Sequence, residues 1–349
     1  MLTQSSSNPS KLLQRNEALF TGRNILVAGN IADSYPATLA ELSQTSTFCY
    51  SDYRYYVQNT AENSDNTPSD SIFTANFENN KALKFDLLLI FIPKSKQETQ
   101  YLLANLTPYL SEGASILLVG EKSCGIKSAG TLLAPYCTQV NNVDSARHCS
   151  LLFGELNKEV AAFNQKQWIK EYDLTINDTT LKISTLPGVF SHGELDKGSD
   201  LLLNNMPETM QGSMLDFGCG AGVIGCYLKQ KHSELQVDLV DISAFALASA
   251  TLTFANNQLE GNVFASNILS NVDKKYDHIV SNPPFHSGKK TDYSATETLI
   301  EQSPAFLKKS GSLILVANHF LKYEPLLDNA FSAVTTKSET TKFKILVAK

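Results

Sequence analysis

One stretch of the sequence decides the fold: MLDFGCGAG, residues 214–222. An apolar strand runs here into a turn with glycine at Gly218, Gly220 and Gly222, and apolar residues then recur at the spacing of a helix face across residues 223–228. Glycine lets the backbone turn tightly and lets a ligand approach the main chain. The helix that follows presents unpaired N–H groups to such a ligand. The stretch therefore predicts a cofactor site at a strand end of an α/β fold.

Two carboxylates bracket this turn. Asp216 precedes the first glycine, and Asp241 ends the strand at residues 237–240, nineteen positions after Gly222. A carboxylate at that strand end can accept both hydroxyls of a ribose. Residues 220–225 also fit the GxGxxG pattern of dinucleotide-binding domains. We favour S-adenosylmethionine as the cofactor, because Asp216 suits its cationic methionyl end, whereas a pyrophosphate disfavours a carboxylate there.

A second motif predicts the chemistry. The strand at residues 278–281 ends in Asn282-Pro283-Pro284-Phe285, and strand ends at the carboxyl edge of a parallel sheet face the ligand crevice. An amino group conjugated to an aromatic base is a poor nucleophile. The Asn282 amide oxygen and the Pro283 carbonyl can hold its hydrogens and turn its lone pair toward a methyl group, while Phe285 stacks on the base. The motif thus predicts methylation of a planar nitrogen; taken alone, it also fits a rigid turn.

The order of these signals occurs twice along the chain. Gly29 and Asp86 are 57 positions apart, and Gly218 and Asp277 are 59 apart; seven positions after each aspartate comes a proline. The repeat predicts two α/β domains, each with alternating strands and helices around a parallel sheet. The first copy has a single glycine at its turn and no Asn-Pro-Pro-Phe motif. We expect it to be structural or substrate-binding, without a cofactor.

Chain length also favours two domains, because 349 residues exceed one ordinary core. We expect a degenerate domain at residues 1–160, a linker at 161–175 and the catalytic domain at 176–349. Residues 155–168 are expected to form a linker or a bridging helix, and residues 59–80 a surface loop.

Composition and charge narrow the function classes. A net charge of −6 counts against a protein that coats free nucleic acid through phosphate contacts. The sequence has no apolar run of membrane-spanning length and no secretory signal at its start. The six cysteines lack a CxxC pair, so we expect reduced thiols, no metal site and a cytoplasmic location.

Several motifs together resemble one family. The sequence is similar to the bacterial ribosomal RNA guanine-N2 methyltransferases, and within them to the small-subunit enzymes, through LPGVFS (186–191), LDKGSDLLL (195–203), DFGCGAGV (216–223), SNPPFH (281–286) and VDSAR (143–147). The resemblance implies two tandem Rossmann-like class I methyltransferase domains, the first degenerate and the second with the S-adenosylmethionine site. It also implies methyl transfer to the exocyclic N2 of a guanine in 16S ribosomal RNA, with the small ribosomal subunit as partner and a monomeric enzyme.

The resemblance also assigns residues. It implies that the cofactor is held by Asp216, Gly218, Gly220, Gly222, Asp241 and Asn267, with Phe190 and Ser199 in a segment that closes over it, and that guanine is received by Asn282, Pro283, Pro284 and Phe285. Candidate RNA contacts are Lys289-Lys290, Lys308-Lys309, Lys342 and Lys344. The motifs leave open the glutamine-N5 methyltransferases of release factors, the DNA adenine-N6 enzymes and the large-subunit guanine-N2 enzymes.

Overall fold

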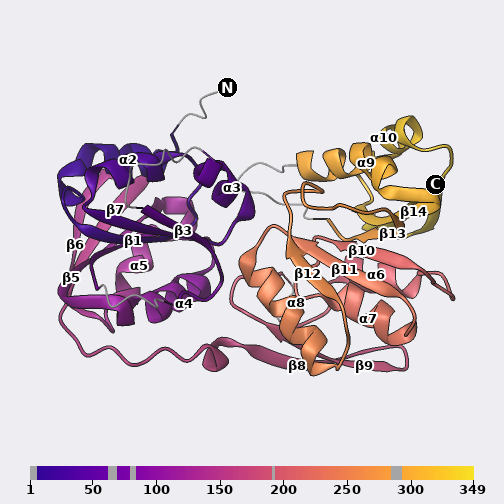
Figure 1. Ribbon diagram of the computed structural model, residues 1–349, viewed down its shortest axis with the longest axis horizontal. Helices are drawn as coiled ribbons and strands as arrows, with labels where there is room; N and C mark the ends of the chain where they lie inside the picture. Colours follow the sequence, from indigo (N-terminus) through magenta and orange to yellow (C-terminus); the bar gives the residue numbers. More distant parts are fainter. Residues whose placement is uncertain (1–5, 62–68, 79–83, 191–192, 284–292) are drawn as a thin grey trace. The chain divides into compact units, whose positions relative to one another are not determined.

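The computed structural model describes residues 6–61, 69–78, 84–190, 193–283 and 293–349. The chain divides into two compact units, Met1–Trp168 and Ile169–Lys349 (Figure 1). The division lies within the stretch predicted as a linker, although residues 170–175 of that stretch belong to a strand.

The first unit alternates strands with helices. Its strands are β1 (Asn24–Gly29), β2 (Thr45–Tyr50), β3 (Ser69–Phe73), β4 (Phe85–Phe91), β5 (Leu110–Glu121), β6 (Cys137–Ala146) and β7 (Cys149–Leu156). Its helices are α1 (Asn8–Leu13), η1 (Gln14–Leu19), α2 (Tyr35–Leu42), α3 (Tyr53–Ala61), α4 (Lys96–Leu106), η2 (Thr107–Tyr109), η3 (Lys122–Cys124), α5 (Ile126–Ala129), η4 (Gly130–Leu132) and η5 (Gln165–Trp168).

The second unit opens with a separate hairpin and then follows the same plan. Its strands are β8 (Lys170–Ile176), β9 (Thr179–Thr185), β10 (Ser213–Phe217), β11 (Gln236–Asp241), β12 (Asn262–Ala265), β13 (Tyr276–Ser281), β14 (Leu307–Asn318), β15 (Val334–Glu339) and β16 (Phe343–Ala348). Its helices are α6 (Lys197–Asn204), α7 (Val223–Lys231), α8 (Ala244–Asn256), α9 (Ser294–Phe306) and α10 (Glu324–Ala330).

Both units have the same sheet. Within the described residues, the strand order is β3-β2-β1-β4-β5-β7-β6 in the first unit and β12-β11-β10-β13-β14-β16-β15 in the second. The first five strands of each order run parallel, the sixth pairs antiparallel with the fifth, and the seventh pairs antiparallel with the sixth. The predicted pair of α/β domains with parallel sheets is confirmed.

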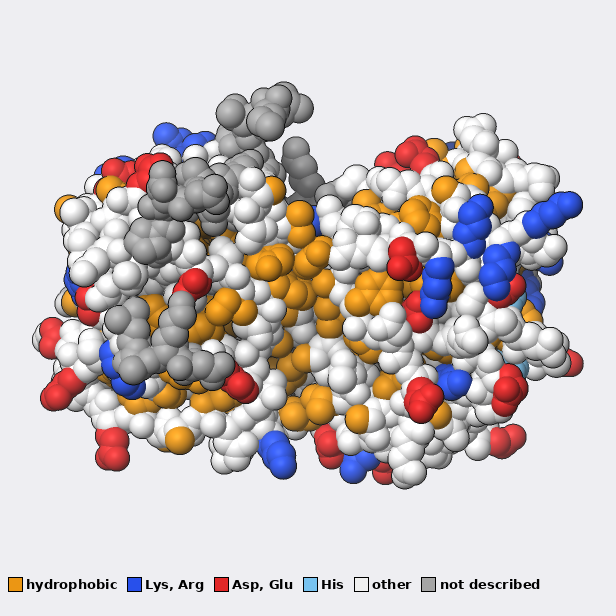
Figure 2. All heavy atoms as spheres, in the orientation of Figure 1, with side chains coloured by type: hydrophobic (Ala, Val, Ile, Leu, Met, Phe, Trp, Pro, Cys, Tyr) orange, Lys and Arg blue, Asp and Glu red, His pale blue; other side chains and the backbone are white. Residues whose placement is uncertain are grey.

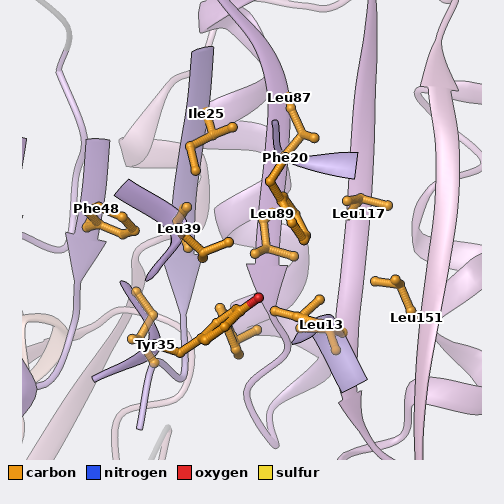
Figure 3. Close-up of a cluster of buried hydrophobic side chains, with 14 of the residues drawn as sticks. Leu13, Phe20, Ile25, Tyr35, Leu39, Phe48, Leu87, Leu89, Leu117 and Leu151 are labelled. Carbon is orange, nitrogen blue, oxygen red and sulfur yellow. The ribbon is translucent and has the colours of Figure 1, made fainter. Parts of the chain in front are cut away.

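The central strands read as continuous apolar runs because helices cover both faces of each sheet (Figure 1). In the first unit, side chains of α1 and α2 and of Phe20, which follows η1, pack on one face of the sheet, and Leu13, Phe20, Tyr35 and Leu39 are all at most 3% exposed (Figure 3). They form one cluster with Ile25 of β1 and with Leu87 and Leu89 of β4.

One hydrogen bond that occurs in both units aligns the two copies residue by residue. The Asp86 carboxylate accepts a hydrogen bond from the backbone N–H of Asn24, and the Asp277 carboxylate accepts one from the backbone N–H of Ser213. Each aspartate thus ties the start of the first central strand to its neighbour. Because Gly29 and Gly218 each follow five positions after those anchored residues, they occupy the same place in the fold.

The residue after that glycine has different backbone partners in the two copies. In the first unit, Gly29 pairs with both β2 and β4, and the Asn30 N–H donates to the carbonyl of Phe91 at 2.8 Å. In the second unit, the N–H groups of Gly218 and Cys219 donate to the carbonyl of Val240 at 2.9 and 3.0 Å. Asn30 is therefore bonded to the end of β4, whereas Cys219 is bonded to β11.

Two local predictions need correction. Of the two alternatives for residues 155–168, the bridging helix is wrong: β7 continues to Leu156, and the rest is irregular apart from the short helix η5. Residues 59–80 are not simply a surface loop, because Asn59 belongs to α3 and is 4% exposed, and β3 adds an edge strand to the sheet.

Candidate active site

The glycine turn has the backbone conformation that the sequence predicts. The φ angles of Gly218, Gly220 and Gly222 are +69°, +55° and +77°, a region that favours glycine. A Cβ atom built on Gly218 or Gly220 meets nothing within 4 Å, whereas one on Gly222 lies 3.1 Å from the Ala250 Cβ. The first two glycines therefore border open space, and the third lets α7 pack closely against α8.

Asp216 lies beneath this turn. Its side chain is fully buried, its Oδ2 accepts a hydrogen bond from the Gly225 N–H at 2.8 Å, and its Oδ1 has no partner among the described residues. Burial raises the pKa of Asp216 to about 7, the Gly225 N–H opposes the rise, and the charge of Asp241 adds to it. Through the Gly225 N–H, the Asp216 carboxylate holds the start of α7 in place next to the glycine turn.

Asp241 supports the turn from the next strand. Its Oδ2 accepts from the Gly220 N–H at 3.0 Å and its Oδ1 accepts from the Ser243 N–H at 2.9 Å. The carbonyl of Asp241 also accepts from the Ser266 N–H, which brings the end of β12 alongside. Asn267 follows there and is exposed, and Ile268 has a φ of +55°, unusual for a β-branched residue.

Asn282 follows the strand on the other side of the turn. The hydroxyl of Ser281 donates to the carbonyl of Phe217 at 2.9 Å, joining the end of β13 to the end of β10. The Asn282 Nδ2 donates to Asp196 Oδ2 at 2.9 Å and to Ser199 Oγ at 2.8 Å. The Asn282 Oδ1 is buried and has no partner among the described residues. A buried acceptor without a partner is costly, and such an atom indicates a place for a donor on a ligand.

Family models cover both units. The model described as "Methyltransferase small domain" matches residues 180–347, and the model described as "Methyltransferase small domain N-terminal" matches residues 10–172. A ribosomal RNA small subunit methyltransferase C of Psychromonas ingrahamii is 62% identical over 340 residues, covering 97% of this chain and 96% of that protein. The chain belongs to this family of methyltransferases.

Other relatives agree with this membership. A ribosomal RNA small subunit methyltransferase C of Aeromonas hydrophila is 46% identical over 340 residues, covering 97% of both chains. The solved structure of the T. thermophilus 16S rRNA N2 G1207 methyltransferase, RsmC, in complex with AdoMet and guanosine, has a TM-score of 0.82 at 22% identity and covers 99% of this chain and 92% of that one. That likeness shows the same two-domain fold.

Within this family fold, the structure brings the glycine turn, Asp241 and Asn282 to one edge of the second sheet. Ser199 is also near, but its described side-chain contact is with Asn282. Phe190 is 64% exposed, and no described contact joins it to the turn. Pro283 is buried directly after Asn282. Pro284, Phe285, His286 and Lys289-Lys290 lie outside the described residues.

Sequence reasoning missed three residues of this site. Asp196 contacts Asn282 from a distant part of the chain, and its only local signal is an aspartate placed to begin a helix. Ser281 links the two central strands through its side-chain hydroxyl, a role that the sequence pattern did not indicate. Ile268, next to Asn267, has a positive φ angle, and no sequence pattern predicts this angle.

One of the candidate RNA contacts is wrong. Lys344 is 6% exposed and pairs with Glu324, so it is a buried structural residue. Lys308 pairs with Asp277 at 2.6 Å at the start of β13 and its side chain is 49% exposed, so its contact with RNA stays a prediction. Lys342 lies beside the end of β14, where its carbonyl accepts from the His319 N–H.

The described residues hold no group of three or more side chains suited to a metal ion. Among them, none of the helices combines the length and apolar character needed to cross a membrane.

Proposed function

We propose that the second unit transfers a methyl group from S-adenosylmethionine to the exocyclic N2 of a guanine in 16S ribosomal RNA. The observation that carries the proposal is the Asn282 amide, whose Oδ1 is buried and has no partner among the described residues, at the same sheet edge as a glycine turn that borders open space. The names of the relatives give the substrate, since proteins up to 62% identical are small-subunit ribosomal RNA methyltransferases. Guanine 1207, the target of the T. thermophilus enzyme, is the position we propose.

The residues at the turn fit this cofactor. Gly218 and Gly220 leave space where any side chain would intrude. Asp241 has its carboxylate oxygens at the strand end, next to the turn, and carboxylate oxygens are acceptors that suit the hydroxyls of a ribose. Asp216 places a titratable carboxylate under the turn, where a cationic methionyl end would be stabilised. We propose Asn267 beside the adenine, and Phe190 in a segment covering the cofactor.

The mechanism follows from what the chain's own residues can do. When bound, S-adenosylmethionine supplies an electrophilic methyl group. Asn282 Oδ1 accepts one N2 hydrogen of guanine, and the Pro283 carbonyl is proposed to accept the other. Holding both hydrogens turns the nitrogen lone pair out of conjugation and toward the methyl group. As positive charge develops on the nitrogen, the fixed dipoles of these oxygens stabilise it. We propose that Pro284 stiffens this segment and that Phe285 stacks on the base, which must first be extruded if it is paired.

The first unit is proposed to be structural or to hold the substrate. Phe91 stands where the second copy has Asn282, and it is 3% exposed. The Asn30–Phe91 backbone hydrogen bond closes the strand end where a cofactor would enter. These two features support a single active site in the chain.

The proposed partner is the small ribosomal subunit, with the enzyme acting as a monomer in the cytoplasm. On the face drawn in Figure 2, Lys and Arg side chains are interspersed with Asp and Glu side chains. Together with the net charge of −6, this distribution supports local recognition of a folded ribonucleoprotein over coating of free RNA.

The test is transfer of labelled methyl groups in four parallel reactions, with small subunits, large subunits, free 16S ribosomal RNA and a release factor as acceptors. The proposal expects label in small-subunit RNA, recovered as N2-methylguanine after digestion and mapped to position 1207. Label in the release factor or the large subunit instead would reject it.

A further inference from the structure

The Asn282 amide is held by the beginning of helix α6. Asp196 is the N-cap residue of this helix, and its Oδ2 accepts from the N–H groups of Gly198 at 2.8 Å and Ser199 at 3.0 Å. The same oxygen accepts from Asn282 Nδ2 at 2.9 Å, and Ser199 Oγ accepts from Nδ2 at 2.8 Å. The cap of α6 therefore provides two acceptors to the amide nitrogen of Asn282.

A carboxylate leaves this amide only one orientation. An ionised carboxylate accepts hydrogen bonds and cannot donate them, whereas a serine hydroxyl can do either. If the amide turned over, Asn282 Oδ1 would lie against the negatively charged Asp196 Oδ2, and the buried end would carry an unpaired N–H instead of an acceptor. The Asp196 charge thus decides between two arrangements of nearly equal shape.

From this geometry we infer that Asp196 is a positioning residue for methyl transfer: its charge keeps the Asn282 oxygen turned toward the substrate amino group. The inference rests on the proposed function, because it assumes that Oδ1 receives a hydrogen of the base. Asp196 itself touches neither substrate nor cofactor in this scheme and acts only through Asn282.

The first copy offers a comparison for Asp196 within the same chain. Ser7 and Asp196 lie 17 positions before the anchored residues Asn24 and Ser213, so they are equivalent in the two copies. Ser7 caps α1 by accepting from the Ser10 N–H at 3.3 Å. A serine therefore suffices to begin this helix. The carboxylate occurs in the copy that has an amide to orient, and the serine in the copy that has Phe91 at that place.

The test variant is Asp196→Asn, because asparagine keeps the shape of the side chain and caps helices about as well as aspartate. It removes the charge and offers an NH₂ donor, so the Asn282 amide loses its preferred orientation. The turnover number on small subunits should fall about 10- to 100-fold. S-adenosylmethionine affinity and the melting temperature should match the parent protein. Asp200→Asn is the matched control, since Asp200 lies on the same helix and its described side-chain partner is Asn204.

A double-mutant cycle separates positioning from mere support of the fold. If Asp196 acts through Asn282, adding Asp196→Asn to Asn282→Ala should leave the residual rate unchanged. An equal rate loss in both backgrounds would overturn the inference, as would an Asp196→Asn enzyme with full turnover. Should Asp196→Asn fail to fold, Asp196→Ser, the residue of the first copy, takes its place in the cycle. Failure of the proposed function can be told apart from failure of this inference, because the parent protein itself would then not label small-subunit RNA. In that case the double-mutant cycle would be measured on the acceptor that the parent protein does label.

Discussion

Replacing Asp216 with asparagine is expected to remove a pH dependence from cofactor binding. Asp216 is fully buried under the glycine turn, and burial raises its pKa to about 7 in the absence of a bound cation. In the unfolded chain the same group titrates near 4, so in the folded protein the neutral form is favoured between these values. A cationic ligand above the turn reverses this preference, because it stabilises the carboxylate.

The sign and size of this pH effect on cofactor affinity follow from proton linkage. S-adenosylmethionine binds more tightly to the ionised form, so binding releases the Asp216 proton and the apparent affinity falls as pH drops through 7. About nine-tenths of the carboxylates are ionised at pH 8 and about one-tenth at pH 6 when the pKa is about 7. The dissociation constant should therefore rise about tenfold between pH 8 and pH 6 through this group.

The measurement is isothermal titration calorimetry with S-adenosylmethionine at pH 6, 7 and 8, for the parent protein and for Asp216→Asn. The α-amino group of the cofactor also titrates, at about 7.7–8.0, but it contributes equally to both proteins. The difference between the two pH profiles therefore isolates Asp216. Identical profiles would refute the reasoning, since they would mean that the buried carboxylate does not sense the cation.

Four further changes separate the roles within the site. Asn282→Ala should lower turnover about 100-fold while cofactor affinity stays within about twofold, measured by labelled methyl transfer and calorimetry; a comparable loss of affinity would contradict the assigned role. Asp241→Ala should weaken cofactor binding about 10- to 100-fold and largely spare turnover at saturating cofactor; unchanged affinity would remove Asp241 from the cofactor site. Gly222→Ala should destabilise the second unit by about 1–3 kcal/mol, because φ is +77° and the new Cβ lies 3.1 Å from that of Ala250. A Cβ at Gly220 meets nothing within 4 Å, so Gly220→Ala should destabilise the second unit less than Gly222→Ala and weaken cofactor binding more. Thermal melts with and without the cofactor measure both effects, and the opposite ranking of the two variants would contradict this prediction.

The sequence predicts the parts of the fold that depend on residues close together in the chain. The strand, the glycine turn and the helix after it occupy 19 consecutive residues, from Ser213 to Lys231, and their pattern of apolar residues and glycines allows one reading. Asp241 ends a buried strand and Asn282 follows another, and both strands pair in parallel with β10, so both residues reach the same sheet edge as the turn. Because the same signals occur twice, the sequence also predicted two domains of one plan.

The parts that sequence does not predict depend on distant contacts. Asp196 and Asn282 are 86 positions apart, and nothing near either residue indicates the other. The edge strand β3 has a polar sequence, so its pairing with β2 comes from the sheet beside it. Lys344 resembles a surface lysine until Glu324 is found beside it in the folded unit.

The different partners of the two turns have a consequence for how this chain can vary. In the first copy, a hydrogen bond between main-chain atoms of Asn30 and Phe91 joins the turn to the end of β4, and among single replacements at position 30 only proline removes its donor. Adding glycines nearby or an asparagine at position 91 would leave both main-chain atoms of this bond in place. The first copy is thus free to vary under the demands of stability and recognition, while the second must keep the residues of its proposed chemistry.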